Sequence, residues 1–189
     1  MTILKYSFEE YAEMVKQFHG SEAPGVLIGG FMVALAVENM KNNILYDAIS
    51  ETRTCLPDAI QLLTPCTIGN GWLKIFNYGR YAVTLYDKGH DLHEGVRVFI
   101  DTQKMKDWPE ISAWFFKLKP RKDQKKEKII DEIRRAGFSI LNIEQVRIQP
   151  EIALKQNKGA IAVCPECMEA YPLADGDKCL PCQNNILYR

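Results

Sequence analysis

Residues 24–37 read PGVLIGGFMVALAV and contain the longest apolar stretch of the chain, Val26–Val37. Pro24 can open a helix, because the amide hydrogen that proline lacks would have no partner in the first turn. The stretch is apolar on nearly all sides, which is typical of a helix at the centre of a folded core. Twelve residues are too few to span a membrane, which takes about 20. The stretch therefore predicts a buried helix.

A second helix is predicted on the N-terminal side of this one. Ser7 and Glu10 have the spacing of a capping box, in which each side chain bonds the backbone amide of the other residue. The apolar residues that follow recur at helical spacing. We expect this helix to end near His19-Gly20.

Further elements are predicted on the C-terminal side. The pattern favours strands at 44–50, 96–100 and 140–148, and helices at 57–63, 107–117 and 125–136. Residues 72–76 and 81–86 flank Asn77-Tyr78-Gly79-Arg80, which is typical of a β-hairpin.

Composition excludes several classes of protein. The chain has 189 residues, of which 47% are hydrophobic, and 24 basic residues balance 24 acidic ones. No overall positive field exists to attract nucleic acid or a membrane surface. The basic run 117–135 also contains acidic residues at spacings that favour pairing within a helix. Glu9, Glu10 and Glu13 stand where a signal peptide needs an apolar run, so we expect a cytoplasmic protein.

The last part of the chain carries four cysteines in two C-x-x-C pairs. Cys164 and Cys167 form the first pair, and Cys179 and Cys182 form the second. Two such turns can direct four thiolates at one ion, which predicts a structural zinc site. An iron centre and a redox dithiol are the alternatives. We therefore divide the chain into a core at 1–150, a linker at 151–158 and a zinc finger at 159–189.

A second set of candidate residues lies in the core. It consists of His19, Cys55 and Cys66. Such residues are more often a helix cap and small buried hydrophobes than a shared site. The sequence around them is more informative. Residues 19–25, HGSEAPG, followed by Gly29, resemble the H-G-H-x-C-P-G-x(3)-G opening of the formylmethanofuran dehydrogenase FmdE family, and residues 55–71, CLPDAIQLLTPCTIGNG, resemble its C-x-x-D-A-I-Q-x-x-T-G-C-T-x-G-x-G block.

The resemblance implies an α+β core with a mixed sheet flanked by helices, loosely similar to thioredoxin. It also implies a C-terminal four-cysteine finger of the treble-clef type and a metal-binding pocket in the core. Three positions depart from the family pattern. Ser21 replaces a histidine, Ala23 replaces a cysteine and Pro65 replaces a glycine. Two ligands of the opening are thus lost, which favours a core pocket without metal.

Two hypotheses follow for function. The first is a metal-binding accessory protein similar to the FmdE proteins, with a structural zinc and a partly degenerate pocket in which His19, Cys55 and Cys66 act as ligands, base or nucleophile. The resemblance implies a molybdenum or tungsten one-carbon dehydrogenase as partner and establishes no activity of the chain's own. The second is a non-catalytic dimerisation or docking module without a core metal. A homodimer is expected under both hypotheses.

Overall fold

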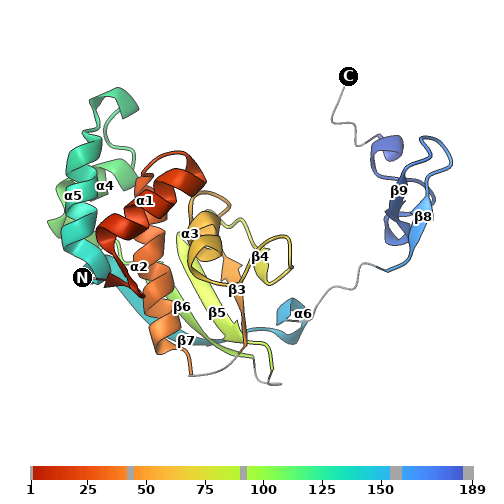
Figure 1. Cartoon of the computed structure of the whole chain (residues 1–189), viewed down its shortest axis with the longest axis horizontal. Helices are drawn as coiled ribbons and strands as arrows, with labels where there is room; N and C mark the ends of the chain where they lie inside the picture. The colour runs from red at the N-terminus through yellow and green to blue at the C-terminus, as the bar shows by residue number, and fades with distance from the viewer. Residues whose placement is uncertain (1, 42–44, 90–92, 154–158, 185–189) are drawn as a thin grey trace. The chain divides into compact units, whose positions relative to one another are not determined.

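The computed structural model describes residues 2–41, 45–89, 93–153 and 159–184 (Figure 1). The chain divides into two compact units between Ala153 and Leu154. His90, one of the histidines of the sequence, lies outside the described residues.

A five-stranded sheet forms the centre of the first unit. Its strands stand in the order β4-β3-β5-β6-β7, and only the β3–β4 pair is parallel. The strands are β3 (Tyr46–Ser50), β4 (Leu73–Ile75), β5 (Ala82–Asp87), β6 (Glu94–Ile100) and β7 (Leu141–Arg147). A two-stranded ribbon, β1 (Thr2–Ile3) and β2 (Tyr6–Ser7), precedes the first helix. The expected mixed sheet is confirmed.

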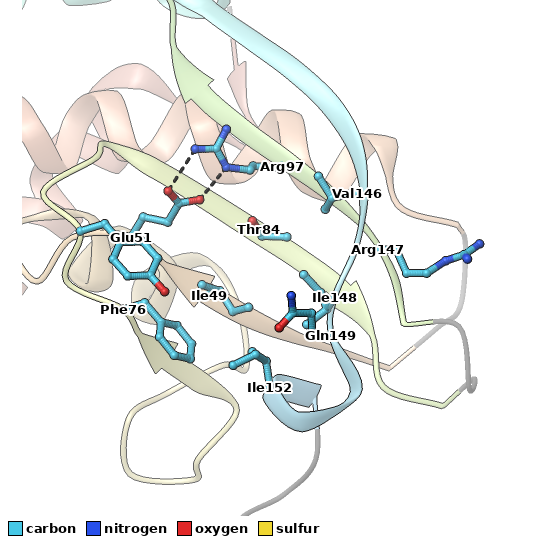
Figure 2. Close-up of a pocket in the computed structure, with 11 residues that line it drawn as sticks. Ile49, Glu51, Phe76, Thr84, Arg97, Val146, Arg147, Ile148, Gln149 and Ile152 are labelled. Carbon is cyan, nitrogen blue, oxygen red and sulfur yellow. Dashed lines mark hydrogen bonds and ion pairs between the residues drawn. The ribbon is translucent and has the colours of Figure 1, made fainter.

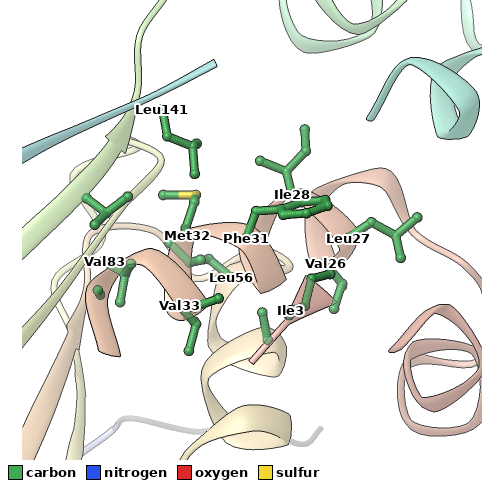
Figure 3. Close-up of a cluster of buried hydrophobic side chains, with 14 of the residues drawn as sticks. Ile3, Val26, Leu27, Ile28, Phe31, Met32, Val33, Leu56, Val83 and Leu141 are labelled. Atoms are coloured by element: carbon green, nitrogen blue, oxygen red, sulfur yellow. The ribbon is translucent and has the colours of Figure 1, made fainter. Parts of the chain in front are cut away.

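Helices pack on one face of this sheet. They are α1 (Phe8–His19), α2 (Pro24–Asn39), α3 (Leu56–Leu63), α4 (Pro109–Phe115) and α5 (Lys126–Ala136). The predicted central helix is α2, which contacts β5 and β6 as well as α1, α3 and α5. Its residues from Gly25 to Ala34 are all buried. Figure 3 shows α2 side chains such as Phe31 and Met32 among those of β1, α3, β5 and β7. The α+β fold with helices flanking the sheet is confirmed.

The ends of α1 follow the sequence closely. The Ser7 side chain accepts from the Glu10 amide, and the Glu10 carboxylate accepts from the Ser7 amide at 2.8 Å, so the capping box is present. Gly20 ends the helix with φ of 83°, a left-handed conformation that glycine adopts without steric cost.

The hairpin expected over residues 72–86 is wrong. β3 lies between β4 and β5 and pairs with both. The chain after β4 remains beside the end of β3, because the amides of Phe76 and Tyr78 donate to the carbonyls of Ser50 and Glu51. Two strand patterns that are adjacent in the sequence, with a turn between them, do not reveal that an earlier strand separates them in the sheet.

The start of α4 is capped by a side chain from another helix. Its N-cap is Trp108, which makes no side-chain cap. Glu132 of α5 caps the helix instead, since its Oε2 accepts from the amides of Glu110 and Ile111 at 2.9 Å each. The buried Glu132 carboxylate thus satisfies two helix-terminal donors from outside the helix.

A short helix, α6 (Pro150–Ala153), lies at the beginning of the predicted linker. The Lys74 ammonium of β4 donates to the carbonyls of Ile152 and Ala153, so α6 is held against the sheet. Within the described residues, no helix is long and apolar enough to cross a membrane.

The second unit is small. Strands β8 (Ile161–Val163) and β9 (Ala170–Pro172) form an antiparallel pair. Short turns at Leu173–Asp175 and Pro181–Gln183 complete it. Its buried residues are Cys164, Tyr171 and Cys179, which is too small a core to be stable without further support.

Candidate functional site

The four C-terminal cysteines converge on one point. The sulfur atoms of Cys164, Cys167, Cys179 and Cys182 all lie within 4.8 Å of one another. The Cys167 and Cys179 sulfurs are 3.6 Å apart. A tetrahedral zinc with Zn–S bonds of about 2.3 Å requires S–S separations of about 3.8 Å. The donor set therefore fits a closed tetrathiolate zinc site.

Local backbone geometry brings these sulfurs together. Cys164 directly follows β8, and its amide donates to the Glu169 carbonyl at 2.9 Å. The Met168 amide donates back to the Cys164 carbonyl, and Met168 has φ of 64°. At the second pair, the Gln183 amide donates to the Cys179 carbonyl and Asn184 has φ of 73°. Each C-x-x-C segment is therefore a tight turn that ends in a left-handed residue.

Backbone donors also favour a thiolate at this site. They lower the pKa of Cys164 to about 6, chiefly through the Cys167 amide and also through that of Cys179. Zinc binds the deprotonated sulfur, so the amides around Cys164 favour metal binding there, whereas contact with Cys179 raises the pKa of the Cys182 thiol in the metal-free protein.

In the core, His19 lies against Asp58. The His19 Nδ1 is 2.5 Å from the Asp58 Oδ2, which joins the last residue of α1 to the first turn of α3. About a third of each side chain remains exposed. The Nδ1 atom is thus occupied by a carboxylate, and Nε2 is the atom left for other contacts.

Cys55 occupies a strained position at the start of α3. Its φ and ψ are 59° and −52°, and the Leu56 amide donates to the Thr54 carbonyl across it at 2.6 Å. This is a γ-turn of the rare positive-φ form, which costs free energy for a residue with a side chain. Such strain in a cysteine is an observation that supports a functional role.

The Cys55 side chain packs against the beginning of α2. A Cβ added to Gly25 would lie 2.8 Å from the Cys55 Cβ and 3.0 Å from its Sγ. The Tyr81 hydroxyl meets the same glycine and donates to its carbonyl at 2.5 Å. Burial, followed by the nearby Asp58 carboxylate, raises the pKa of the Cys55 thiol. Cys55 is therefore a neutral thiol at pH 7.

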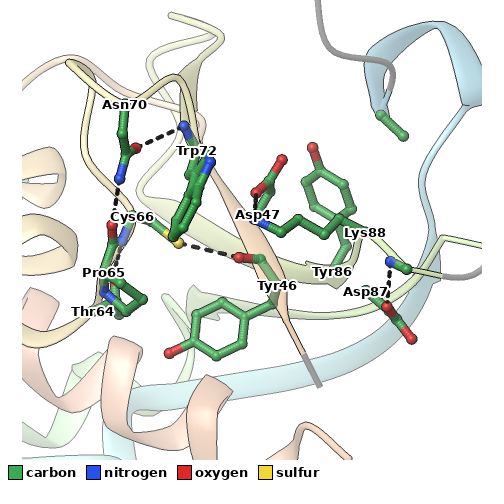
Figure 4. Close-up of polar contacts among 12 residues, drawn as sticks. Tyr46, Asp47, Thr64, Pro65, Cys66, Asn70, Trp72, Tyr86, Asp87 and Lys88 are labelled. Atoms are coloured by element: carbon green, nitrogen blue, oxygen red, sulfur yellow. Dashed lines mark hydrogen bonds and ion pairs between the residues drawn. The ribbon is translucent and has the colours of Figure 1, made fainter. Parts of the chain in front are cut away.

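Cys66 belongs to a different cluster (Figure 4). It is fully buried, and its Sγ lies 3.5 Å from the Tyr46 carbonyl, to which it donates. Burial raises the pKa of Cys66 to about 11. Nearby, the Lys88 ammonium pairs with Asp47 at 3.2 Å and lies 3.5 Å from the centre of the Trp72 ring.

The three predicted core residues do not form one ligand set. Among the described residues, the C-terminal cysteines are the one group of three or more His, Cys, Asp or Glu ligand atoms within 4.8 Å of each other. His19 and Cys55 are both linked to Asp58, His19 by direct contact and Cys55 through its charge, whereas Cys66 lies near Asp47.

The loop from Thr64 to Gly71 uses its polar groups internally. Asn70 Oδ1 accepts from the amides of Thr67 and Trp72, and the Asn70 amide group donates to the Pro65 carbonyl. The Thr64 hydroxyl accepts from the Cys66 amide. The amides of Cys66, Thr67 and Trp72 are therefore bonded within the loop, which holds Cys66 in place.

Sequence reasoning missed two tyrosines that contact the beginning of α2 near Cys55. Tyr81 and Tyr11 donate to the carbonyls of Gly25 and Val26, and both hydroxyls have raised pKa values because they are buried. Residues so distant in sequence give no local signal of this contact. Gly25 was the available clue, because a glycine in the first turn of a helix permits close approach of other groups.

Comparison with known proteins agrees with this geometry. The family model FmdE, described as belonging to the molybdenum formylmethanofuran dehydrogenase operon, matches residues 18–148. The chain belongs to the FmdE family. The FmdE treble clef zinc finger model matches residues 155–189 and contains the four converging cysteines.

Two relatives extend the comparison. The crystal structure of a tungsten formylmethanofuran dehydrogenase FmdE-like protein from Syntrophus aciditrophicus is 56% identical, covering 100% of this chain and 98% of its own, with a TM-score of 0.91. A probable S-adenosyl-L-methionine-binding protein of Archaeoglobus fulgidus is 29% identical over 88% of this chain. The present chain spans only 50% of the length of that relative. The resemblance to the FmdE family and its treble-clef finger is therefore confirmed.

Proposed function

We propose that this FmdE-family protein is a metal-binding accessory protein in which the finger holds a structural zinc and the core presents a recognition pocket. The observation that carries the proposal is the convergence of the four finger sulfurs. Four thiolates close the coordination sphere and leave no position for a substrate, which is typical of a structural site. Because the finger has so small a core of its own, zinc supplies its folding free energy.

The proposed recognition pocket lies where α1, α2 and α3 meet. Its polar groups are His19 Nε2 and the Cys55 thiol. Asp58 contacts the other ring nitrogen of His19, and Tyr81 donates to the carbonyl of Gly25, against which Cys55 packs. The departures Ser21 and Ala23 remove two ligands of the family opening. We propose that the pocket works without a core metal and binds its target through hydrogen bonds.

We propose a second copy of the chain and a molybdenum or tungsten one-carbon dehydrogenase as partners. Support comes from the operon association of the family and from the dehydrogenase named for the Syntrophus relative. The balanced charge of the chain supports partners other than nucleic acid.

Metal analysis of the full-length protein tests the proposal. Wild type is expected to hold one zinc per chain, a Cys167→Ser/Cys182→Ser variant none, and a Cys55→Ser/Cys66→Ala variant one. Zinc lost from the core variant would contradict the proposed location. Iron in place of zinc would contradict the proposed metal.

The alternative function is a non-catalytic dimerisation or docking module without a core metal. The raised pKa values of Cys55 and Cys66 favour it, because a neutral thiol is a poor nucleophile and a poor ligand. A partner complex that survives Cys55→Ser unchanged would support this version over chemistry in the pocket.

A further inference from the structure

A cavity lies on the face of the sheet opposite α2. It has a volume of about 280 Å³ and is lined by residues of β3, β5, β6 and β7 and of the segments that follow β3, β4 and β7 (Figure 2). Its floor includes Ile49, Thr84 and Arg97, which stand opposite one another in register across three strands. Their sequence neighbours Ala48, Val83 and Val98 belong to the core beneath the helices. Alternation along the strands therefore places this cavity on the other side of the sheet from Cys55.

Two of the three charged residues that line the cavity, Glu51 and Arg97, form an ion pair with each other. Glu51 is 6% exposed and accepts from Arg97 Nε and Nη2 at 2.5 and 3.0 Å. Arg80 contacts the same carboxylate at 2.6 Å, and Arg97 Nη1 donates to Glu144 at 2.8 Å. Two carboxylates thus face two guanidinium groups, and the third charged residue of the lining, Arg147, extends its side chain away from the other lining residues in Figure 2. The cavity therefore does not favour a charged ligand over a neutral one of the same shape.

One buried polar group in the cavity lacks a partner. Thr84 is 3% exposed, and within the described part of the chain its hydroxyl makes no hydrogen bond. Every fully enclosed side-chain polar atom of the described residues does have a partner. The Thr84 oxygen is thus not sealed in the core, but opens into the cavity. Leaving such a group unbonded costs free energy, which a ligand or water recovers.

The remaining walls are apolar, with one further polar group. Phe76, Ile148 and Ile152 line the cavity, and Phe76 stacks with Tyr78 at a centroid distance of 6.1 Å. Figure 2 shows the Gln149 amide beside Ile148, and this amide has no hydrogen-bond partner among the described residues. The cavity thus combines apolar walls with a hydroxyl and an amide, as small-molecule sites do.

We propose that this cavity, which we call the outer-face pocket, binds a small neutral molecule with one flat apolar ring and an amide-like polar group. Thr84 and Gln149 hydrogen-bond the polar group, and the ring packs on Phe76 and the isoleucines. The volume lies just below the range of about 300–1,000 Å³ typical of drug-sized ligands, so a single ring is the expected size. The proposal is independent of the finger zinc and of the Cys55 site.

Binding of benzamide to the full-length protein tests this proposal by saturation-transfer NMR and titration. A ligand of this size is expected to bind with a Kd of about a millimolar. Thr84→Val keeps the shape of the side chain and removes only the hydroxyl, so binding should weaken about five- to tenfold. Thr84→Ser retains the hydroxyl and should bind nearly as wild type.

The matched controls separate a lost contact from a lost fold. Thr84→Val removes no hydrogen bond of the protein, so its Tm is expected to equal or exceed that of wild type. Cys55→Ser, on the other face of the sheet, should leave benzamide binding unchanged. No benzamide binding by wild type, or equal binding by Thr84→Val, overturns the proposal. Tighter binding of benzoate than of benzamide overturns the neutral ligand class.

Discussion

His19 and Asp58 are 39 residues apart in sequence, and their side chains meet at 2.5 Å between Nδ1 and Oδ2. The contact connects the C-terminal end of α1 to the first turn of α3, where a carboxylate is also favoured by the helix dipole. It fixes the orientation of the imidazole ring at the first turn of α3, the helix whose N-cap is the strained Cys55. The histidine of the family motif is thus held by a carboxylate of the second motif.

The first prediction concerns the strength of this contact. A double-mutant cycle with His19→Gln and Asp58→Asn should give a coupling free energy of about 0.5–1 kcal/mol, because both side chains are partly exposed to solvent. The measurement is urea denaturation of the two single variants and the double variant. A coupling energy near zero would mean that the pair does not form in solution.

The second prediction concerns the reactivity of Cys55. Burial and the Asp58 charge raise the pKa of its thiol, so little thiolate exists at pH 7.5 and alkylation by iodoacetamide should be slow. The rate should increase as the pH rises above 9. Asp58→Asn removes the nearby negative charge, which lowers the pKa and should speed alkylation at fixed pH. Mass spectrometry of the Cys55 peptide measures this rate.

Asp58→Glu is the matched control for this experiment, because it retains the negative charge. Its alkylation rate should remain close to that of wild type. Rapid alkylation of wild-type Cys55 at pH 7 would contradict the prediction and would indicate an activated thiolate.

The third prediction concerns Cys66 and the pH dependence of stability. Its pKa is about 11 in the folded protein, against an ordinary value of 9.0. Between pH 9 and pH 11 the thiol loses its proton in the unfolded chain but keeps it in the folded protein. The contribution of Cys66 to stability is therefore complete below pH 9 and is lost as the pH rises through 11. The Tm of wild type should therefore fall more steeply between pH 9 and pH 11 than that of Cys66→Ala. Parallel Tm curves for the two proteins would show that Cys66 is not buried as a thiol.

The fourth prediction concerns removal of the finger metal. Zinc binds thiolates, so its affinity should fall as the pH is lowered and protons compete for the sulfurs. A chelator should unfold the finger and leave the circular dichroism of the core helices in place. Cys179→Ser should reproduce this result without chelator. Loss of the core helices on chelation would instead show that the fold of the core depends on the finger metal.

Local pattern predicted the helices well and the sheet pairing poorly. The capping box at Ser7, the apolar run after Pro24 and Gly137 after α5 each act within a few residues, so the sequence displays them directly. The insertion of β3 between β4 and β5 depends on pairing between distant segments, which periodicity does not record.

The site residues show the same division. The finger cysteines were predictable because their spacing and chemistry are local. The link from His19 to Asp58 and the contact of Tyr81 with Gly25 arise from packing of separate elements. The separation of Cys66 from Cys55 arises in the same way. Cys55 is the N-cap of α3, whereas Cys66 lies in the loop that follows the C-terminal end of this helix.

The last prediction concerns the close packing of α2 on α3. A Cβ added to Gly29 would lie 2.7 Å from the Ala59 Cβ, closer than carbon atoms tolerate. Gly29→Ala should therefore lower the free energy of unfolding by about 1–3 kcal/mol. The exchanged pair Gly29→Ala/Ala59→Gly moves the methyl group to the other helix and should recover part of this loss. Gly69→Ala is the matched control, because only the Thr67 Oγ1, at 4.0 Å, lies near its added Cβ. Equal destabilisation by Gly29→Ala and Gly69→Ala would contradict the close contact, because a methyl group added at Gly29 would then meet no more steric hindrance than one added at Gly69.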